Sequence, residues 1–153
     1  MRIAALMAIS AIALMPNLPA AAGPVPMETV FTEMGLFGHW ALDCGRPPTS
    51  ANPHVRIASP EPGEVEEVHD HGPAFSANRY RILSAERMGD DRLQVTAIFQ
   101  PGTDASQLQT LAFQVGRGTR RTVFNQPDGA AVRVKDGVVV ASGRRTPVLR
   151  KCE

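Results

Sequence analysis

The sequence has no excess of charge of either sign and few aromatic residues. Its formal net charge is +1 over 153 residues, so no concentrated positive field favours a nucleic acid or a membrane surface as partner. Aromatic residues make up 5% of the chain, and the arginine-rich C-terminal half lacks the interleaved aromatics that stack on bases. We therefore expect no nucleic-acid partner and a charged exterior formed by Arg117, Arg120, Arg121, Arg133, Arg144 and Arg145.

The sequence also lacks a signature of catalysis. No serine lies in a Gly-x-Ser-x-Gly motif, the arrangement that exposes a nucleophile on a sharp turn. Asp90 and Asp91 are adjacent and follow Gly89, which predicts a solvated hairpin tip in place of a carboxylate pair. We expect no enzyme and no cofactor.

No hydrophobic run is long enough to cross a membrane, which takes about 20 residues. The apolar run from Ile3 to Met15 follows Arg2 and precedes small residues that end at Ala22. This pattern predicts a signal peptide over residues 1–22, removed before Gly23. An uncleaved anchor is the alternative, which the polar and proline-containing stretch after Met15 disfavours. We expect a periplasmic or secreted protein without a membrane span after cleavage.

The chain has only two cysteines, Cys44 and Cys152. In an exported protein two cysteines are usually paired, because the compartment is oxidising. The sequence thus predicts a disulfide that joins the start of one β domain to its end.

Long amphipathic helices are absent, and short apolar-polar alternation dominates after residue 38, with turn residues between the runs. This pattern is typical of an all-β barrel or sandwich. We expect an entry segment with a short helix at residues 23–37, which covers the domain as a plug, and a β domain at residues 38–153. Its predicted strands are His39 to Cys44, His54 to Ala58, Glu64 to His69, Arg79 to Ala85, Arg92 to Gln100, Leu108 to Gly116, Thr119 to Asn125, Ala131 to Lys135, Val138 to Ser142 and Pro147 to Cys152.

Three local signals are the clearest. Within Arg92 to Gln100 the apolar residues occupy every second position, as in a half-buried strand. Asp136-Gly137 lies between two valine-containing runs and predicts a tight hairpin, because this pair suits positive φ angles. The irregular loop from Gly45 to Pro53 is a reasonable place for the mouth of a cavity.

Gly38-His39-Trp40, at the start of the first predicted strand, resembles the G-x-W motif of lipocalins, which are small exported barrels that hold one apolar ligand. The resemblance implies that Trp40 closes the barrel floor and that a basic residue of the last strand packs over it. Arg150, Arg145 and Arg144 are the candidates, and strand parity favours Arg150. We predict a single antiparallel β-barrel of eight to ten strands with a short N-terminal helix; the alternative is a two-sheet β-sandwich.

The expected disulfide constrains that barrel. Antiparallel first and last strands would bring the end of one near the start of the other, yet both cysteines lie at predicted strand ends. Either the two strands run parallel, or one cysteine lies in a tail that folds back.

A longer pattern covers most of the mature chain. It comprises Gly38-x-Trp40-x-x-Asp43-Cys44, Pro47, Asn52-Pro53-x-Val55, Val134-Lys-Asp-Gly137, Ser142-Gly143 and Thr146-Pro-x-Leu149-x-x-Cys152. The pattern resembles a group of small uncharacterised exported proteins of proteobacteria. The resemblance implies export and a disulfide, and it implies no substrate.

Glu67, His69 and His71 form the one local cluster of possible metal ligands. On a straight strand they share one face, where two imidazoles and a carboxylate can hold zinc or copper. The alternative is a solvated edge strand whose charges discourage edge-to-edge pairing.

Taken together, these patterns predict an exported, non-enzymatic binding protein for a small apolar ligand or the surface of a partner protein. Trp40, Phe99 and Phe113 are the candidate ligand-binding residues. One alternative is a periplasmic metal-binding protein that uses Glu67, His69 and His71. Another is a structural or accessory envelope protein without a ligand pocket.

Overall fold

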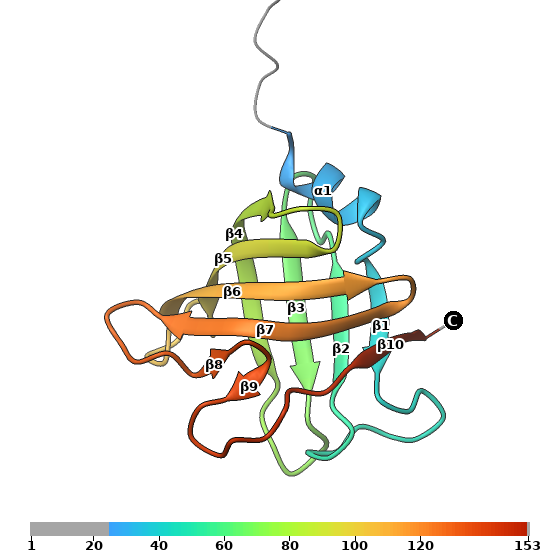
Figure 1. The fold of residues 1–153 in the computed structure, drawn as a ribbon, viewed down its shortest axis with the longest axis vertical. Coiled ribbons are helices and arrows are strands. Elements are labelled where there is room, and N and C mark those ends of the chain that lie inside the picture. The colour runs from blue at the N-terminus through green and yellow to red at the C-terminus, as the bar shows by residue number, and fades with distance from the viewer. Residues whose placement is uncertain (1–24, 153) are drawn as a thin grey trace, which may run out of the picture.

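The computed structural model describes residues 25–152. The predicted signal peptide, residues 1–22, lies outside the described residues, as does Glu153. The described chain forms one short helix followed by ten strands (Figure 1). These are α1 (Met27–Glu33), β1 (Gly38–Ala41), β2 (His54–Ala58), β3 (Val65–Asp70), β4 (Asn78–Arg87), β5 (Arg92–Phe99), β6 (Gln107–Gly116), β7 (Thr119–Pro127), β8 (Val134–Lys135), β9 (Val138–Val139) and β10 (Leu149–Cys152).

Eight of the strands close into an antiparallel barrel. Strands β1 to β7 pair in sequence order, β10 pairs with β1, and a second pairing of β10 with β7 closes the cylinder. Strands β8 and β9 form an additional hairpin beside β7. The predicted all-β barrel with a short helix is therefore confirmed, and the two-sheet sandwich is not the fold.

Alternation along the strands builds the barrel core. On β5, Leu93, Val95 and Ala97 are buried while Gln94 and Thr96 are only partly covered, as the sequence predicts. The hairpin between β8 and β9 also agrees with the prediction, because Asp136 and Gly137 have φ angles of 51° and 71°, the positive values that a tight hairpin turn requires.

Helix α1 covers one end of the barrel (Figure 1). A helix of seven residues is not stable by itself in water. It is held because Val30 and Phe31 are buried in the barrel core, where Met34 and Phe37 pack against the same cluster. The helix thus forms the plug that the sequence predicts. No helix among residues 25–152 is long and apolar enough to cross a membrane.

The predicted disulfide is present, with Cα atoms of Cys44 and Cys152 5.6 Å apart. Strands β1 and β10 run antiparallel, with His39 opposite Cys152, so the parallel alternative is wrong. Strand β1 ends at Ala41, three residues earlier than predicted, and Cys44 lies in the turn that follows. The chain leaves the ladder there and folds back toward β10, which is how both cysteines meet.

Candidate functional site

A cavity of about 690 Å³ lies at the end of the barrel away from α1. Its walls come from β2, β3, β4, β6 and β7, and its rim from residues 50–53 and from residues 139–149. Small-molecule sites in proteins typically enclose about 300–1,000 Å³. The cavity is therefore large enough for one small ligand, and the loop after β1 does contribute to its mouth, as the sequence predicts.

The cavity has an apolar wall. Val55 of β2, Leu111 of β6 and Leu149 of β10 line it and are 2%, 5% and 7% exposed. Val134 of β8 extends this wall. These side chains alternate with outward residues on their strands, so the barrel itself presents them to the cavity.

Arg120, which lines the cavity, forms a buried ion pair with Glu67, which does not line it. Arg120 of β7 and Glu67 of β3 are 3% and 2% exposed, and Nη2 of Arg120 donates to both carboxylate oxygens of Glu67 at 2.9 and 3.1 Å. His69, two residues along β3, lies 2.5 Å from Oε1 of Glu67 through its Nε2. The Arg120 guanidinium also stacks on Phe113, with Cζ 4.3 Å from the ring centroid, which is a favourable cation–π arrangement.

The electrostatics of this ion pair keep Glu67 ionised. Burial by itself would raise the pKa of Glu67, but the Arg120 charge and the hydrogen bond from His69 lower it to about 2. Burial and the nearby Glu67 carboxylate raise the pKa of Tyr80, which also lines the cavity, to about 12. At neutral pH the cavity is thus lined by the Arg120 guanidinium and the neutral Tyr80 phenol, while the Glu67 carboxylate is ionised against Arg120 outside the lining.

One donor of Arg120 has no partner. Both contacts to Glu67 use Nη2, so the pair is not the two-nitrogen fork that arginine and carboxylate commonly form. Nη1 is buried and makes no hydrogen bond with any described residue. A buried donor without an acceptor costs about 1–3 kcal/mol and is uncommon in native proteins.

A second buried polar pair lines the cavity. Gln109 of β6 and Asn125 of β7 line the cavity at 1% and 8% exposure, and Nδ2 of Asn125 donates to Oε1 of Gln109 at 2.8 Å. Asn125 pairs in register with Leu111, so this polar pair adjoins the apolar wall.

The rim is strongly basic. Besides Arg120, four arginines line the cavity, and no aspartate or glutamate does so among residues 25–152. Arg121 donates to the backbone oxygen of Gly137 at 2.8 Å, and none of the four forms an ion pair with a described residue. The four are Arg121, Arg133, Arg144 and Arg145.

Sequence analysis placed Arg120 on the barrel exterior, and this was wrong. The pairing of β6 with β7 skips Val123, which forms a bulge. A bulge inserts one residue and reverses the side-chain alternation on one side of it. Strict alternation from the buried Val123 and Asn125 would point the Arg121 side chain into the barrel. Because of the bulge, the Arg120 side chain points inward instead.

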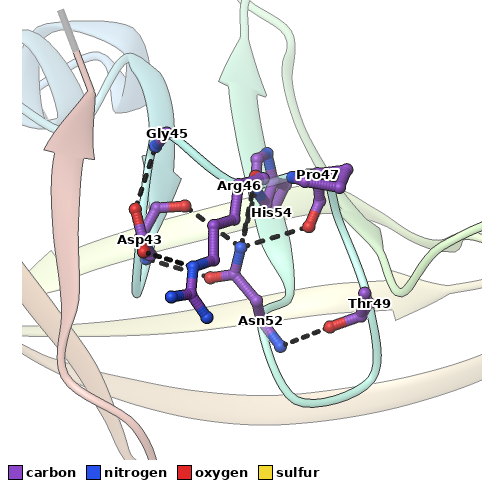
Figure 2. Close-up of polar contacts among 7 residues, drawn as sticks. All are labelled: Asp43, Gly45, Arg46, Pro47, Thr49, Asn52 and His54. Carbon is purple, nitrogen blue, oxygen red and sulfur yellow. Dashed lines mark hydrogen bonds and ion pairs between the residues drawn. The ribbon is translucent and has the colours of Figure 1, made fainter.

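Asn52 organises the loop that forms one side of the mouth (Figure 2). Its Oδ1 accepts the backbone N–H of Asp43 at 2.9 Å, and its Nδ2 donates to the backbone oxygen of Asp43 at 3.0 Å. The same amide group lies 3.3 Å from the backbone oxygens of Arg46 and Pro47. By holding Asp43 away from the β ladder, Asn52 ends β1 and fixes residues 50–53 at the rim. Sequence analysis singled out this loop but not the residue that orders it.

His39 and His54, which are distant in sequence, lie side by side on the outer face of β1 and β2. Nε2 of His39 and Nδ1 of His54 are 2.8 Å apart, and Nε2 of His54 lies 3.2 Å from Nδ2 of Asn52. Burial, with the His54 ring and Arg56 nearby, lowers the pKa of His39. Neither histidine lines the cavity, so the pair supports the loop through Asn52.

None of the predicted ligand-binding aromatics lines the cavity. Trp40 is 1% exposed and lies at the α1 end, where its Nε1 donates to the backbone oxygen of Leu36 at 2.8 Å. Phe113 lies beneath Arg120, and the ring of Phe99 is 5.2 Å from that of Tyr80. Phe113 and Phe99 therefore support residues that do line the cavity.

The basic residue over Trp40 is Lys151, and the expected Arg150, Arg145 and Arg144 do not occupy this position. Lys151 pairs with Trp40 in register, its Nζ is 5.5 Å from the ring centroid, and the ammonium donates to the backbone oxygen of Gly35 at 2.8 Å. The parity argument for Arg150 was wrong because it counted Cys44 as part of β1.

Glu67 and His69 lie on β3, and His71 follows the end of that strand. The rings of His69 and His71 are 6.3 Å apart, and Glu67 is engaged by Arg120. Burial and, to a smaller extent, the charge of His69 lower the pKa of His71. The nearby Asp70 carboxylate acts in the opposite direction. Among residues 25–152, no group of three or more His, Cys, Asp or Glu side chains is arranged to hold a metal ion.

Comparison with known proteins assigns no family. A segment of 62 residues is 42% identical to protocadherin gamma-B6 of Homo sapiens and of Pan troglodytes. The match covers 39% of this chain and 6% of those proteins, too little to show membership. No protein-family model matches the chain, and no solved structure matches it.

Proposed function

We propose that this chain is an exported, non-enzymatic binding protein that holds one small ligand in the cavity at the open end of its barrel. The observation that carries the proposal is the cavity of about 690 Å³, which has an apolar wall and a few buried polar groups. This combination is typical of small-ligand sites, in which apolar surface supplies affinity and polar groups fix orientation.

The construction of the barrel supports the same function. Core residues fill the α1 end, and the cavity of about 690 Å³ lies at the other end of the barrel. Small closed barrels are able to hold one ligand in this way. Export is supported by the Cys44–Cys152 disulfide, because such bonds persist in oxidising compartments.

The direct test is native mass spectrometry of the full-length gene product, purified gently from the organism that makes it. We expect a retained small molecule at one per chain. Leu111→Trp, which places an indole in the cavity, should abolish retention. The matched control is Leu108→Trp, on the same strand but 41% exposed, which should retain the molecule.

A folded Leu111→Trp variant that retains the same molecule would contradict the proposal. A chain that carries no small molecule but a bound envelope protein would support the accessory role. Stoichiometric zinc or copper that is lost on replacing His69 and His71 with alanine would support the metal-binding role.

A further inference from the structure

We propose that the ligand is an amphiphilic organic anion, whose acidic group binds at Arg120 and whose apolar body lies against Val55, Leu111 and Leu149. This inference rests on the proposed ligand-binding function of the cavity and names the chemical class of the ligand. It is carried by the unused donor of Arg120, by the charge of the rim and by the position of the apolar wall.

Arg120 supplies the central contact. Both hydrogen bonds that Arg120 donates to Glu67 come from Nη2. The other terminal nitrogen, Nη1, has no acceptor, and the Arg120 side chain is only 3% exposed. A carboxylate, sulfonate or phosphate oxygen is the acceptor that a guanidinium N–H binds most strongly. Phe113 below the guanidinium and Glu67 beside it keep the group in place, so little ordering is needed when an anion binds.

The charge around the cavity favours the same class of ligand. Five arginines line it, and the one carboxylate in contact with any of these guanidinium groups, among the described residues, is Glu67 beneath them. The whole chain carries a formal charge of only +1, so positive charge is gathered at this mouth. A concave site lined by one sign of charge focuses its field and attracts the opposite charge.

The apolar wall favours an organic anion over a small inorganic one. Val55, Leu111 and Leu149 are buried and line the cavity, and Val134 extends the same surface. An ion such as phosphate would contact the arginines and leave this surface facing water. An anion with a hydrocarbon portion covers both the guanidinium groups and the wall.

The test is isothermal titration calorimetry of the folded full chain with three ten-carbon probes, decanoate, decanol and decylammonium, in a buffer without phosphate. We expect decanoate to bind at least about tenfold more tightly than decanol, and decylammonium to bind more weakly than either. Raising the salt concentration should weaken decanoate binding and leave decanol binding unchanged, because salt screens only the charged contact.

The decisive variant is Arg120→Lys. A lysine ammonium can still pair with Glu67 but has no second nitrogen for a ligand. We expect this variant to lose about tenfold or more in decanoate affinity with decanol affinity unchanged. Replacing Arg144 and Arg145 together with glutamine should lower decanoate affinity a few-fold and flatten its salt dependence. Arg117→Gln is the charge control, since Arg117 is exposed in the β6–β7 turn and does not line the cavity.

If Arg120→Lys does not fold, as judged by near-ultraviolet circular dichroism, the double variant Glu67→Gln/Arg120→Met takes its place, with the same expectation. Equal binding of decanol and decanoate, or an unchanged decanoate affinity in the Arg120 variant, would overturn the inference and leave the ligand-binding function standing. If no probe binds and native mass spectrometry finds no retained molecule, the proposed function fails together with the inference.

Discussion

The two ends of the barrel differ in packing: one is filled with apolar side chains, and the other holds buried polar groups around a cavity. At the α1 end, Trp40, Phe31 and Leu36 are each 1% exposed, and the one polar atom of Trp40 has its acceptor. At the other end, Glu67, Gln109 and Arg120 are buried around a cavity, and Nη1 of Arg120 has no partner. The filled end stabilises the fold, whereas the open end keeps one unsatisfied buried donor, of the kind that binding sites retain.

Removing Trp40 would break the filled end most severely. We expect Trp40→Ala to lower the free energy of unfolding by about 3–5 kcal/mol, because it leaves a large void in a packed core. Urea denaturation followed by circular dichroism measures this change. Leu83→Ala, at a side chain that is 49% exposed, should cost less than about 0.5 kcal/mol. Equal losses in the two variants would show that the α1 end is not the stabilising core.

The disulfide should have the next largest effect. Replacing Cys44 and Cys152 together with serine should lower the free energy of unfolding by about 3–4 kcal/mol, since the bond closes a loop with a sequence separation of 108. Urea denaturation of the oxidised wild-type protein, the reduced wild-type protein and the double variant measures this difference. A double variant as stable as the oxidised protein would contradict this expectation.

Acid should act on the open end through Glu67. Its folded pKa, about 2, lies below the ordinary value of 4.5, so its stabilising contribution is complete above about pH 4.5 and is lost as the pH falls toward 2. A fall of this size corresponds to roughly 3 kcal/mol. We expect urea denaturation at pH 6, 4 and 2.5 to show a loss that Glu67→Gln removes. Glu66→Gln, on the outer face of the same strand, is the control and should keep the wild-type pH dependence.

The smallest expected effect concerns the rim. Asn52→Ala removes the side-chain hydrogen bonds that hold the loop after β1 (Figure 2) and should cost about 1–2 kcal/mol. Binding should suffer more than folding, because the neighbouring Ser50, Ala51 and Pro53 line the cavity. Thermal unfolding and calorimetry with decanoate would separate the two effects. A loss of stability without a loss of affinity would place Asn52 in the scaffold alone.

The strands, the short helix and the turns could be predicted from the sequence better than the chemistry of the open end. Apolar alternation and turn residues are local signals, so the ten strands, the short helix and the Asp136-Gly137 turn were predictable. The disulfide followed from there being only two cysteines. Export and the resemblance to exported proteins of proteobacteria stay predictions.

The open end depends on features that alternation does not encode. The bulge at Val123 reverses parity and turns Arg120 inward. The early end of β1 after Ala41 depends on Asn52, eleven residues later. Because Cys44 lies outside β1, its parity does not indicate which residue lies opposite Trp40, and that residue is Lys151 instead of Arg150. Both errors come from side chains that meet only in the folded chain.

The closure of the barrel by β10 has a consequence for the order in which the protein folds. Strand β1 has β10 as one of its two neighbours, and β10 ends at Cys152. A chain made from its N-terminus therefore cannot complete the ladder of its first strand until β10 has been made. The bond between Cys44 and Cys152 cannot form before then either, so the disulfide joins the first strand region to a partner made more than a hundred residues later.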